Sequence, residues 1–258
     1  MSFSIDWLDL REPADHAARN PELIKTLAQW CAGRAPRILD LGSGTGSSYR
    51  GLAPMIGGHW TLTDIDPALL QEATRRHQAE PTFAATRVVD LNADLESLIT
   101  EVQPDVICGS ALIDLASAAW LDRLAAALPQ NAAFYMALSY NGFEQWLPAP
   151  TDEAAAHAAF LSHQRTDKGF GQALGPDAAN YMADALTKTG RQPALRDSPW
   201  TLGETDRPLI AALADGSAEA VAETSALSDA KLESWAAGRR AVQTVEVGHL
   251  DLLALPAA

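Results

Sequence analysis

The sequence lacks the features of a disulfide-stabilised, membrane-spanning or metal-binding protein. It has only two cysteines, Cys31 and Cys108, and both lie in apolar surroundings, so two buried free thiols are expected. No C-x-x-C or H-x-x-x-H spacing points to a metal site. No apolar run reaches the ~18 residues of a bilayer-spanning helix, and the chain start lacks a signal-peptide pattern. We therefore expect a cytoplasmic protein with neither a metal nor a membrane partner.

Positive charge is also scarce. Lys and Arg together number 19 against 33 Asp and Glu, which gives 258 residues a formal net charge of -14. Nucleic acids and anionic membranes would be repelled by this field, and no run of Lys or Arg offsets it. A small-molecule substrate is the expected partner, and the oligomeric state stays open.

Short β-rich apolar runs alternate with helical patterns between residues 36 and 140. This alternation is typical of a parallel sheet with helices on both faces. The expected strands are Arg37–Leu41, Trp60–Asp64, Thr86–Asp90, Asp105–Cys108 and Ala133–Leu138, and helices are expected at Pro67–Gln78 and Ala118–Leu128.

The flanking segments complete one expected domain, residues 1–258. Asn20 and Pro21 predict the start of a helix that runs to Cys31. Two Ala-rich stretches are expected to be helical insertions that form a cap or substrate pocket. The expected divisions are an N-terminal helical segment (1–35), a cofactor-binding core (36–140), cap insertions (141–176 and 203–240), and the last helix and strands of the sheet (177–202 and 241–258).

The most informative segment is the glycine-rich turn after the first expected strand, Asp40-Leu41-Gly42-Ser43-Gly44-Thr45-Gly46. Such a turn lets a ligand lie directly against the backbone. A dinucleotide turn reads G-x-G-x-x-G. Here the third glycine, Gly46, comes one position early, and Ser47 stands where that motif has its third glycine. The carboxylate of Asp40 disfavours a pyrophosphate and suits the cationic amino group of S-adenosylmethionine.

A second acid supports this ligand. Asp64 ends the next expected strand, eighteen residues beyond Gly46, where doubly wound folds present a carboxylate to ribose hydroxyls. Asp66 is a rival, but it precedes Pro67 and a helical pattern, so we interpret it as the helix N-cap. Ile65 is expected to lie against the adenine.

Together these motifs resemble the class I S-adenosylmethionine-dependent methyltransferases over residues 36–140. The resemblance implies a Rossmann-like α/β fold with a seven-stranded, mostly parallel sheet in the order 3-2-1-4-5-7-6 and S-adenosyl-L-methionine as cofactor. It also implies that Asp90 and Leu91, after the third strand, contact adenine. The segment Gly109–Leu115 with Ser110 would line the methionine side. Asp90 could instead cap a turn before Asn92, and Asp114 could begin the following helix.

The polar N-terminal segment offers a further cofactor contact. Arg11 or Arg19 could pair with the carboxylate of the methionine moiety, because a guanidinium matches a carboxylate. The alternative is an ion pair with Asp15 or Glu12.

Methyl transfer from a sulfonium is an in-line displacement, and only a protonated nucleophile needs a general base. His163 and Asp167 are candidates because they precede a glycine-rich segment, 168–176, which is expected to be a mobile loop. Tyr140 is a further candidate, and by their position after the fifth expected strand Tyr140, Asn141, Phe143 and Trp146 are expected to line the pocket. Exposed histidines and a plain turn are the alternative, and His249 is expected to be structural.

The sequence thus predicts S-adenosylmethionine-dependent methyl transfer to a small molecule. It has no Asn-Pro-Pro-Tyr-like segment, which marks transfer to amide or base nitrogens in this superfamily. One alternative is a non-catalytic module that binds S-adenosylmethionine or a partner. A nicotinamide-dependent oxidoreductase is a second, disfavoured by the glycine spacing.

Overall fold

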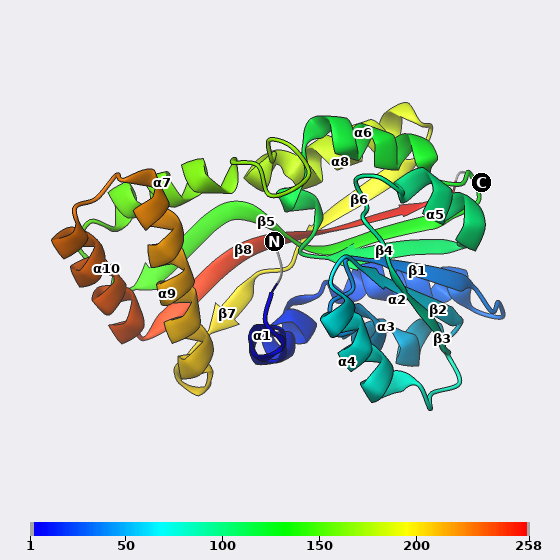
Figure 1. The fold of residues 1–258 in the computed structure, drawn as a ribbon, viewed down its shortest axis with the longest axis horizontal. Coiled ribbons are helices and arrows are strands. Elements are labelled where there is room, and N and C mark those ends of the chain that lie inside the picture. The colour runs from blue at the N-terminus through cyan, green and yellow to red at the C-terminus, as the bar shows by residue number, and fades with distance from the viewer. Residues whose placement is uncertain (1–2, 257–258) are drawn as a thin grey trace.

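The computed structural model describes residues 3–256, which form an α/β structure around one central sheet (Figure 1). The sheet has eight strands in the order β3-β2-β1-β4-β5-β8-β6, and β7 pairs with β8 beyond β6. The strands are β1 (Arg37–Leu41), β2 (His59–Asp64), β3 (Phe83–Val88), β4 (Val106–Ser110), β5 (Ala133–Leu147), β6 (Gln192–Asp197), β7 (Trp200–Leu202) and β8 (Thr244–Leu255).

Helices follow most of these strands in the chain. They are α1 (Ile5–Ala18), α2 (Pro21–Cys31), α3 (Ser47–Ile56), α4 (Pro67–His77), α5 (Leu95–Val102), α6 (Ala118–Ala127), α7 (Glu153–Gln164), α8 (Ala178–Lys188), α9 (Arg207–Thr224) and α10 (Asp229–Ala241). Short 3-10 turns lie at η1 (Ile113–Leu115), η2 (Gly175–Asp177) and η3 (Glu204–Asp206).

The strand directions confirm the expected topology. Strands β1 to β5 pair in parallel, and β8 runs antiparallel to β5, β6 and β7. If β6 and β7 are taken together as a sixth strand and β8 as the seventh, the order is the expected 3-2-1-4-5-7-6. A parallel sheet must be covered on both faces, which explains why four of the five residues of β1 are buried.

Two helical layers cover the sheet (Figure 1). On one face α5, α6 and α8 bury a core that includes Leu121, Phe134 and Leu186. On the other face α2, α3 and α4 bury a core that includes Leu27 and Trp60. The parallel strands therefore end together at one edge of the sheet, between the two layers.

The sheet continues on one side as a long ribbon. The later parts of β5 and β8 extend beyond the other strands with β7, and α7, α9 and α10 lie at the end of this ribbon (Figure 1). Two further apolar clusters hold this region: one contains Trp146, Trp200 and Ile210, and the other contains Ala156 and Trp235.

Three expected strand boundaries were wrong. The third strand ends at Val88, so Asp90 lies in the turn that follows. The fifth strand continues to Leu147, because β8 pairs with it past a bulge between Met136 and Ser139. Tyr140, Asn141, Phe143 and Trp146 therefore lie within the strand.

The third correction concerns the late strand expected within residues 177–202. It is divided into β6 and β7 at Ser198 and Pro199, and both parts pair with the long β8.

Several local predictions were confirmed. The side chains of Asn20 and Asp66 accept hydrogen bonds from the first turns of α2 and α4, as N-caps do. Cys31 and Cys108 are buried free thiols. Within residues 3–256, no helix is long and apolar enough to cross a membrane.

Candidate functional site

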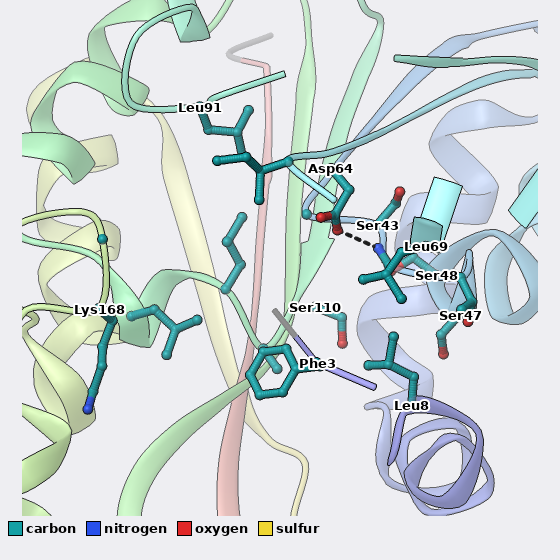
Figure 2. Close-up of a pocket in the computed structure, with 18 of the residues that line it drawn as sticks. Phe3, Leu8, Ser43, Ser47, Ser48, Asp64, Leu69, Leu91, Ser110 and Lys168 are labelled. Atoms are coloured by element: carbon teal, nitrogen blue, oxygen red, sulfur yellow. Dashed lines mark hydrogen bonds between the residues drawn. The ribbon is translucent and has the colours of Figure 1, made fainter. Parts of the chain in front are cut away.

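A cavity opens where the parallel strands end (Figure 2). In doubly wound folds, ligands bind at this edge. The strand-end residues that line it are Gly42, Ser43, Gly44, Thr45, Ser47, Ser48, Asp64, Ile65, Leu69, Val89, Asp90, Leu91, Asn92, Ser110, Ala111, Leu112 and Leu115. The remaining described lining residues come from the chain start and from a distant loop: Phe3, Leu8, Arg11, Asp15, Lys168, Gly169 and Phe170.

The glycine-rich turn forms the floor of the cavity. Gly42, Gly44 and Gly46 have φ angles of 61°, 54° and 90°, which residues other than glycine rarely adopt. A Cβ at Gly44 would lie 3.0 Å from Leu8 of α1. Gly42 and Gly44 line the cavity, whereas Gly46 lies underneath and begins α3. The turn thus exposes backbone and aims the N-terminus of α3 at the cavity.

Asp64 is held in place at the end of β2. Its Oδ2 accepts a hydrogen bond from Gly44 N at 2.9 Å, and its Oδ1 accepts one from Asp66 N at 3.0 Å (Figure 2). Each carboxylate oxygen has a second lone pair, so Asp64 can also accept hydrogen bonds from ligand hydroxyls. This backbone support fixes the direction of the carboxylate.

The wall beside Asp64 is mostly apolar. Ile65 is 57% exposed and Leu91 is buried, and both line the cavity with Leu112. Such a slot suits a flat ring. Asp90 also lines the cavity, and its Oδ1 accepts a hydrogen bond from Asn92 N at 2.8 Å. Asp90 therefore caps the turn and at the same time reaches the site.

Asp40 lies behind the glycine turn instead of in the cavity wall. It is fully buried, and burial raises the pKa of its carboxyl from 3.8 to about 7, although Arg19 opposes this. Oδ2 of Asp40 and two guanidinium nitrogens of Arg19 have no hydrogen-bond partner in the protein. The third nitrogen, Nη2, lies 3.5 Å from Ser48 Oγ. A buried and incompletely satisfied polar pair thus supports the floor of the cavity.

Arg11 reaches the cavity from α1. Its guanidinium donates to both carboxylate oxygens of Asp15, at 2.9 and 3.1 Å, and lies 5.0 Å from the ring centroid of Trp200. Trp200 in turn donates to Asp15 Oδ1. The expected alternative of an ion pair with Asp15 is therefore present, and Arg11 still lines the cavity.

Ser110 lines the middle of the cavity and is followed by a second buried acid. Burial raises the pKa of Asp114 from 3.8 to about 6, and Arg11 acts in the opposite direction. Oδ1 of Asp114 has no hydrogen-bond partner in the protein. Asp114 lies in η1, between the lining residues Leu112 and Leu115.

The loop that contains Lys168, Gly169 and Phe170 closes one end of the cavity. Nζ of Lys168 lies 3.3 Å from both ring nitrogens of His163 and points away from the glycine turn (Figure 2). Burial lowers the pKa of the Lys168 ammonium. Asn92 donates through Nδ2 to the carbonyl of Gly169. The loop is thus tied to the strand ends and to α7.

The three catalytic candidates lie outside this lining. Tyr140 donates to Glu144 at 3.1 Å and lies 3.3 Å from His157. His163, in the last turn of α7, lies 3.0 Å from Glu223. Asp167 accepts hydrogen bonds from Gly169 N and Gly171 N. His163 and Asp167 therefore hold the loop and α7 in place in this structure.

His249 of β8 is buried beside Trp200, with ring centroids 5.1 Å apart. Burial lowers the pKa of its imidazole to about 3, so the ring is neutral at physiological pH. Among residues 3–256 there is no group of three His, Cys, Asp or Glu side chains that could hold a metal ion.

Sequence reasoning missed the parts of the site that come from distant segments. Phe3, Leu8 and Asp15 line the cavity because α1 packs across the strand ends. Lys168 and Phe170 belong to the segment expected to be a mobile loop, and that expectation rests on the glycines of the loop alone. A large apolar residue between two glycines, Gly169-Phe170-Gly171, was the available sign of an inward-facing contact.

Comparison with known families gives one sequence match. Residues 38–131 match the family described as a methyltransferase domain, Methyltransf_25. The matched segment runs from β1 to the residues before β5, so it contains the glycine-rich turn, Asp64 and Ser110. No curated protein sequence matches the chain.

Similar solved structures share the fold. A cyclopropane-fatty-acyl-phospholipid synthase-like protein from Lactobacillus casei is 17% identical, with 97% of this chain and 94% of that chain covered and a TM-score of 0.51. Cyclopropane synthase MmaA2 from Mycobacterium tuberculosis is 16% identical, with coverages of 97% and 94% and a TM-score of 0.50. A chain of the Haloferax volcanii complex with the Trm112 methyltransferase activator is 16% identical, with coverages of 98% and 94% and a TM-score of 0.52.

Proposed function

We propose that the chain is a class I S-adenosylmethionine-dependent methyltransferase, which binds S-adenosylmethionine and methylates a small molecule. The observation that carries the proposal is the left-handed glycine turn at the end of β1, which lies beside Asp64 in one cavity. The residues around it suit each part of this cofactor.

Each polar part of the cofactor has a matching group. Asp64 accepts hydrogen bonds from the ribose hydroxyls, as a carboxylate at this position of the fold does. The N-terminus of α3 and Arg11 favour the methionine carboxylate. Asp40 provides negative charge behind the turn for the cofactor's ammonium group.

The apolar slot receives the adenine. Ile65, Leu91 and Leu112 would provide its surfaces, and Asp90, which lines the same cavity, would accept a hydrogen bond from the amino group. Backbone exposed by Gly42 and Gly44 lets the methionine portion lie close to the floor. These contacts would fix the cofactor along its length.

Bound S-adenosylmethionine supplies an electrophilic methyl group on a sulfonium. The protein contributes alignment and exclusion of water, which provide much of the rate of such a displacement. Ser110 and the loop from Lys168 to Phe170 line the space in which an acceptor would be aligned. Tyr140, His163 and Asp167 lie outside the cavity lining, so as candidates for proton transfer they would have to move toward the acceptor.

We also propose that the chain is one methyltransferase domain in which the segments 141–176 and 203–240 form the cap. The first segment supplies the loop that lines the cavity. The second supplies α9 and α10, whose Trp235 and Arg239 contact Glu153 of α7. The described lining residues include none from the second segment, 203–240, so the loop of the first segment, α1 and the strand ends would enclose the acceptor, in a space that suits a small molecule.

Calorimetric titration with S-adenosylhomocysteine, the product of the cofactor, tests the proposal. Asp64→Ala is expected to weaken binding at least tenfold, because each hydrogen bond to a charged group contributes about 1.5–3 kcal/mol. Asp66→Ala is the matched control: it removes a helix cap at a cost of about 1 kcal/mol in stability and should leave the affinity unchanged. If the unchanged protein binds no S-adenosylhomocysteine, the proposal is wrong.

A further inference from the structure

We propose that the methyl acceptor is an uncharged, largely apolar molecule that lies against Phe3, Leu115 and Phe170, between the middle of the cavity and the end opposite Asp64. This inference rests on the proposed function, because it concerns the part of the cavity that the cofactor contacts leave free. Figure 2 shows the two ends, with Asp64 and Ser43 on one side, Lys168 on the other, and Phe3 and Ser110 between them.

The apolar wall is rigidly supported by buried groups. The ring of Phe170 packs against Trp120 with centroids 5.0 Å apart. Trp120 is 2% exposed, and its Nε1 donates to Leu91 O at 3.0 Å. The carbonyl of Phe170 accepts a hydrogen bond from Ser117 N. Phe170 is therefore a preformed surface, and a preformed apolar surface favours an apolar ligand with little ordering cost.

The cations at this end of the cavity are already engaged. Arg11 is paired through two hydrogen bonds with Asp15, and the proposed function assigns its remaining donors to the methionine carboxylate of the cofactor. The Lys168 ammonium faces the His163 ring. Burial lowers its pKa, and the negative charge of Glu223 opposes this shift by favouring the protonated form. The ammonium points away from the glycine turn (Figure 2). An acceptor with a carboxylate or phosphate would lose its hydration without gaining a free cation in return.

A cationic acceptor is disfavoured for a different reason. It would share the cavity with the positively charged sulfonium of the cofactor, and the lining carboxylate of Asp15 is already paired with Arg11. Like charges repel strongly where water is excluded. A nucleophilic nitrogen must also be unprotonated to have a lone pair. An uncharged acceptor avoids both penalties and gains from burial of its apolar surface.

The test compares three probes that share one ring system and differ in charge: 2-naphthol, 2-naphthoate and 2-naphthylmethylammonium. Each is titrated at pH 7 into protein saturated with S-adenosylhomocysteine, and binding is followed by ligand-observed NMR. We expect 2-naphthol to bind at least tenfold more tightly than either charged probe. If a charged probe binds as tightly, or if none binds, the proposal is overturned.

Two substitutions locate the probe. Phe170→Ala and Phe3→Ala are each expected to weaken 2-naphthol binding at least fivefold, with S-adenosylhomocysteine affinity within twofold of the unchanged protein. Phe143→Ala is the matched control, since Phe143 is 47% exposed on β5 and lies outside the cavity lining. Because Phe3 is exposed at the chain start, its variant keeps the test valid if Phe170→Ala unfolds.

The two proposals fail in different ways. Loss of S-adenosylhomocysteine binding in the unchanged protein contradicts the proposed function and is measured before any probe is added. Normal cofactor binding with 2-naphthol binding that survives both Phe3→Ala and Phe170→Ala contradicts only the acceptor proposal.

Discussion

Asp40 lowers the stability of the empty protein. Its carboxylate is fully buried with one oxygen unpartnered, and its pKa is raised to about 7 by burial. An acid whose pKa is higher in the folded than in the unfolded state destabilises folding wherever it would otherwise be ionised. The destabilisation is absent below pH 4, grows as the pH rises toward 7, and is constant above that.

Asp40→Asn is therefore expected to raise the free energy of unfolding of the cofactor-free protein at pH 8. The rise in pKa from 3.8 to about 7 corresponds to at most about 4 kcal/mol. The gain should shrink steadily below pH 7 and vanish near pH 4, which urea unfolding of both proteins across this range would measure. A gain that does not change with pH would show that Asp40 does not titrate in this way.

The same substitution should weaken cofactor binding, because the ammonium group loses the negative charge behind the turn. In the unchanged protein, S-adenosylhomocysteine affinity should fall as the pH drops below 7, where Asp40 becomes protonated. In Asp40→Asn this pH dependence should flatten. Calorimetry at pH 6 and pH 8 distinguishes the two proteins.

At the scale of elements, the loop before η2 connects the cap to the strand ends. Asp167 accepts hydrogen bonds from Gly169 N and Gly171 N, which stabilises the loop internally. Asn92 Nδ2 binds the Gly169 carbonyl, and Leu174 N binds Ala116 O. The loop must release some of these contacts for a ligand to enter or leave, because Gly169 and Phe170 line the cavity.

Asn92→Ala removes the side-chain contact between the loop and the turn after β3. Loss of one hydrogen bond of about 1 kcal/mol should speed release of S-adenosylhomocysteine roughly fivefold. Stopped-flow displacement measures this rate. Asn131→Ala, at an exposed asparagine before β5, should leave the rate unchanged. An Asn92→Ala rate equal to that of the unchanged protein would mean that this contact does not retain the ligand.

At the scale of the whole molecule, one buried arginine joins the cap to the sheet. Arg239 of α10 is fully buried between Trp146 and Trp235, with ring centroids 4.1 and 4.4 Å away. Its Nη2 lies 2.7 Å from Glu144 of β5 and 2.5 Å from Glu153 of α7. Three elements that are distant in the chain therefore meet at one guanidinium.

Arg239→Met leaves two carboxylates without their cation, one of them almost fully buried. Breaking a buried ion pair in this way costs about 3–5 kcal/mol, so we expect a loss of this size in the free energy of unfolding. The adjacent Arg240→Met is the control, because its pair with Asp215 is about half exposed and contributes less than about 1 kcal/mol. Urea unfolding compares the two. Equal losses would refute the assigned role of Arg239.

The cofactor side of the site could be predicted from the sequence because its signals are local. Gly42 and Gly44 reveal a left-handed turn through their own backbone freedom, and the strand pattern places Asp64 at a strand end. The ends of the strands were less predictable from the sequence. The fifth strand was expected to end at Leu138, yet pairing with β8 carries it through Asn141 and Gly142 to Leu147.

The sequence by itself thus determined the alternation of strands and helices, the strand order through its family resemblance, and the glycine-rich turn after β1 with the nearby Asp64. Only the tertiary structure decided which distant segments complete the cavity. Asp15 meets Trp200 across 185 positions, and Asn92 meets Gly169 across 77. Whether such residues meet depends on the packing of α1 and of the loop against the sheet. Local pattern carries no information about that packing, since the free energy of these contacts comes from burial between elements far apart in the chain.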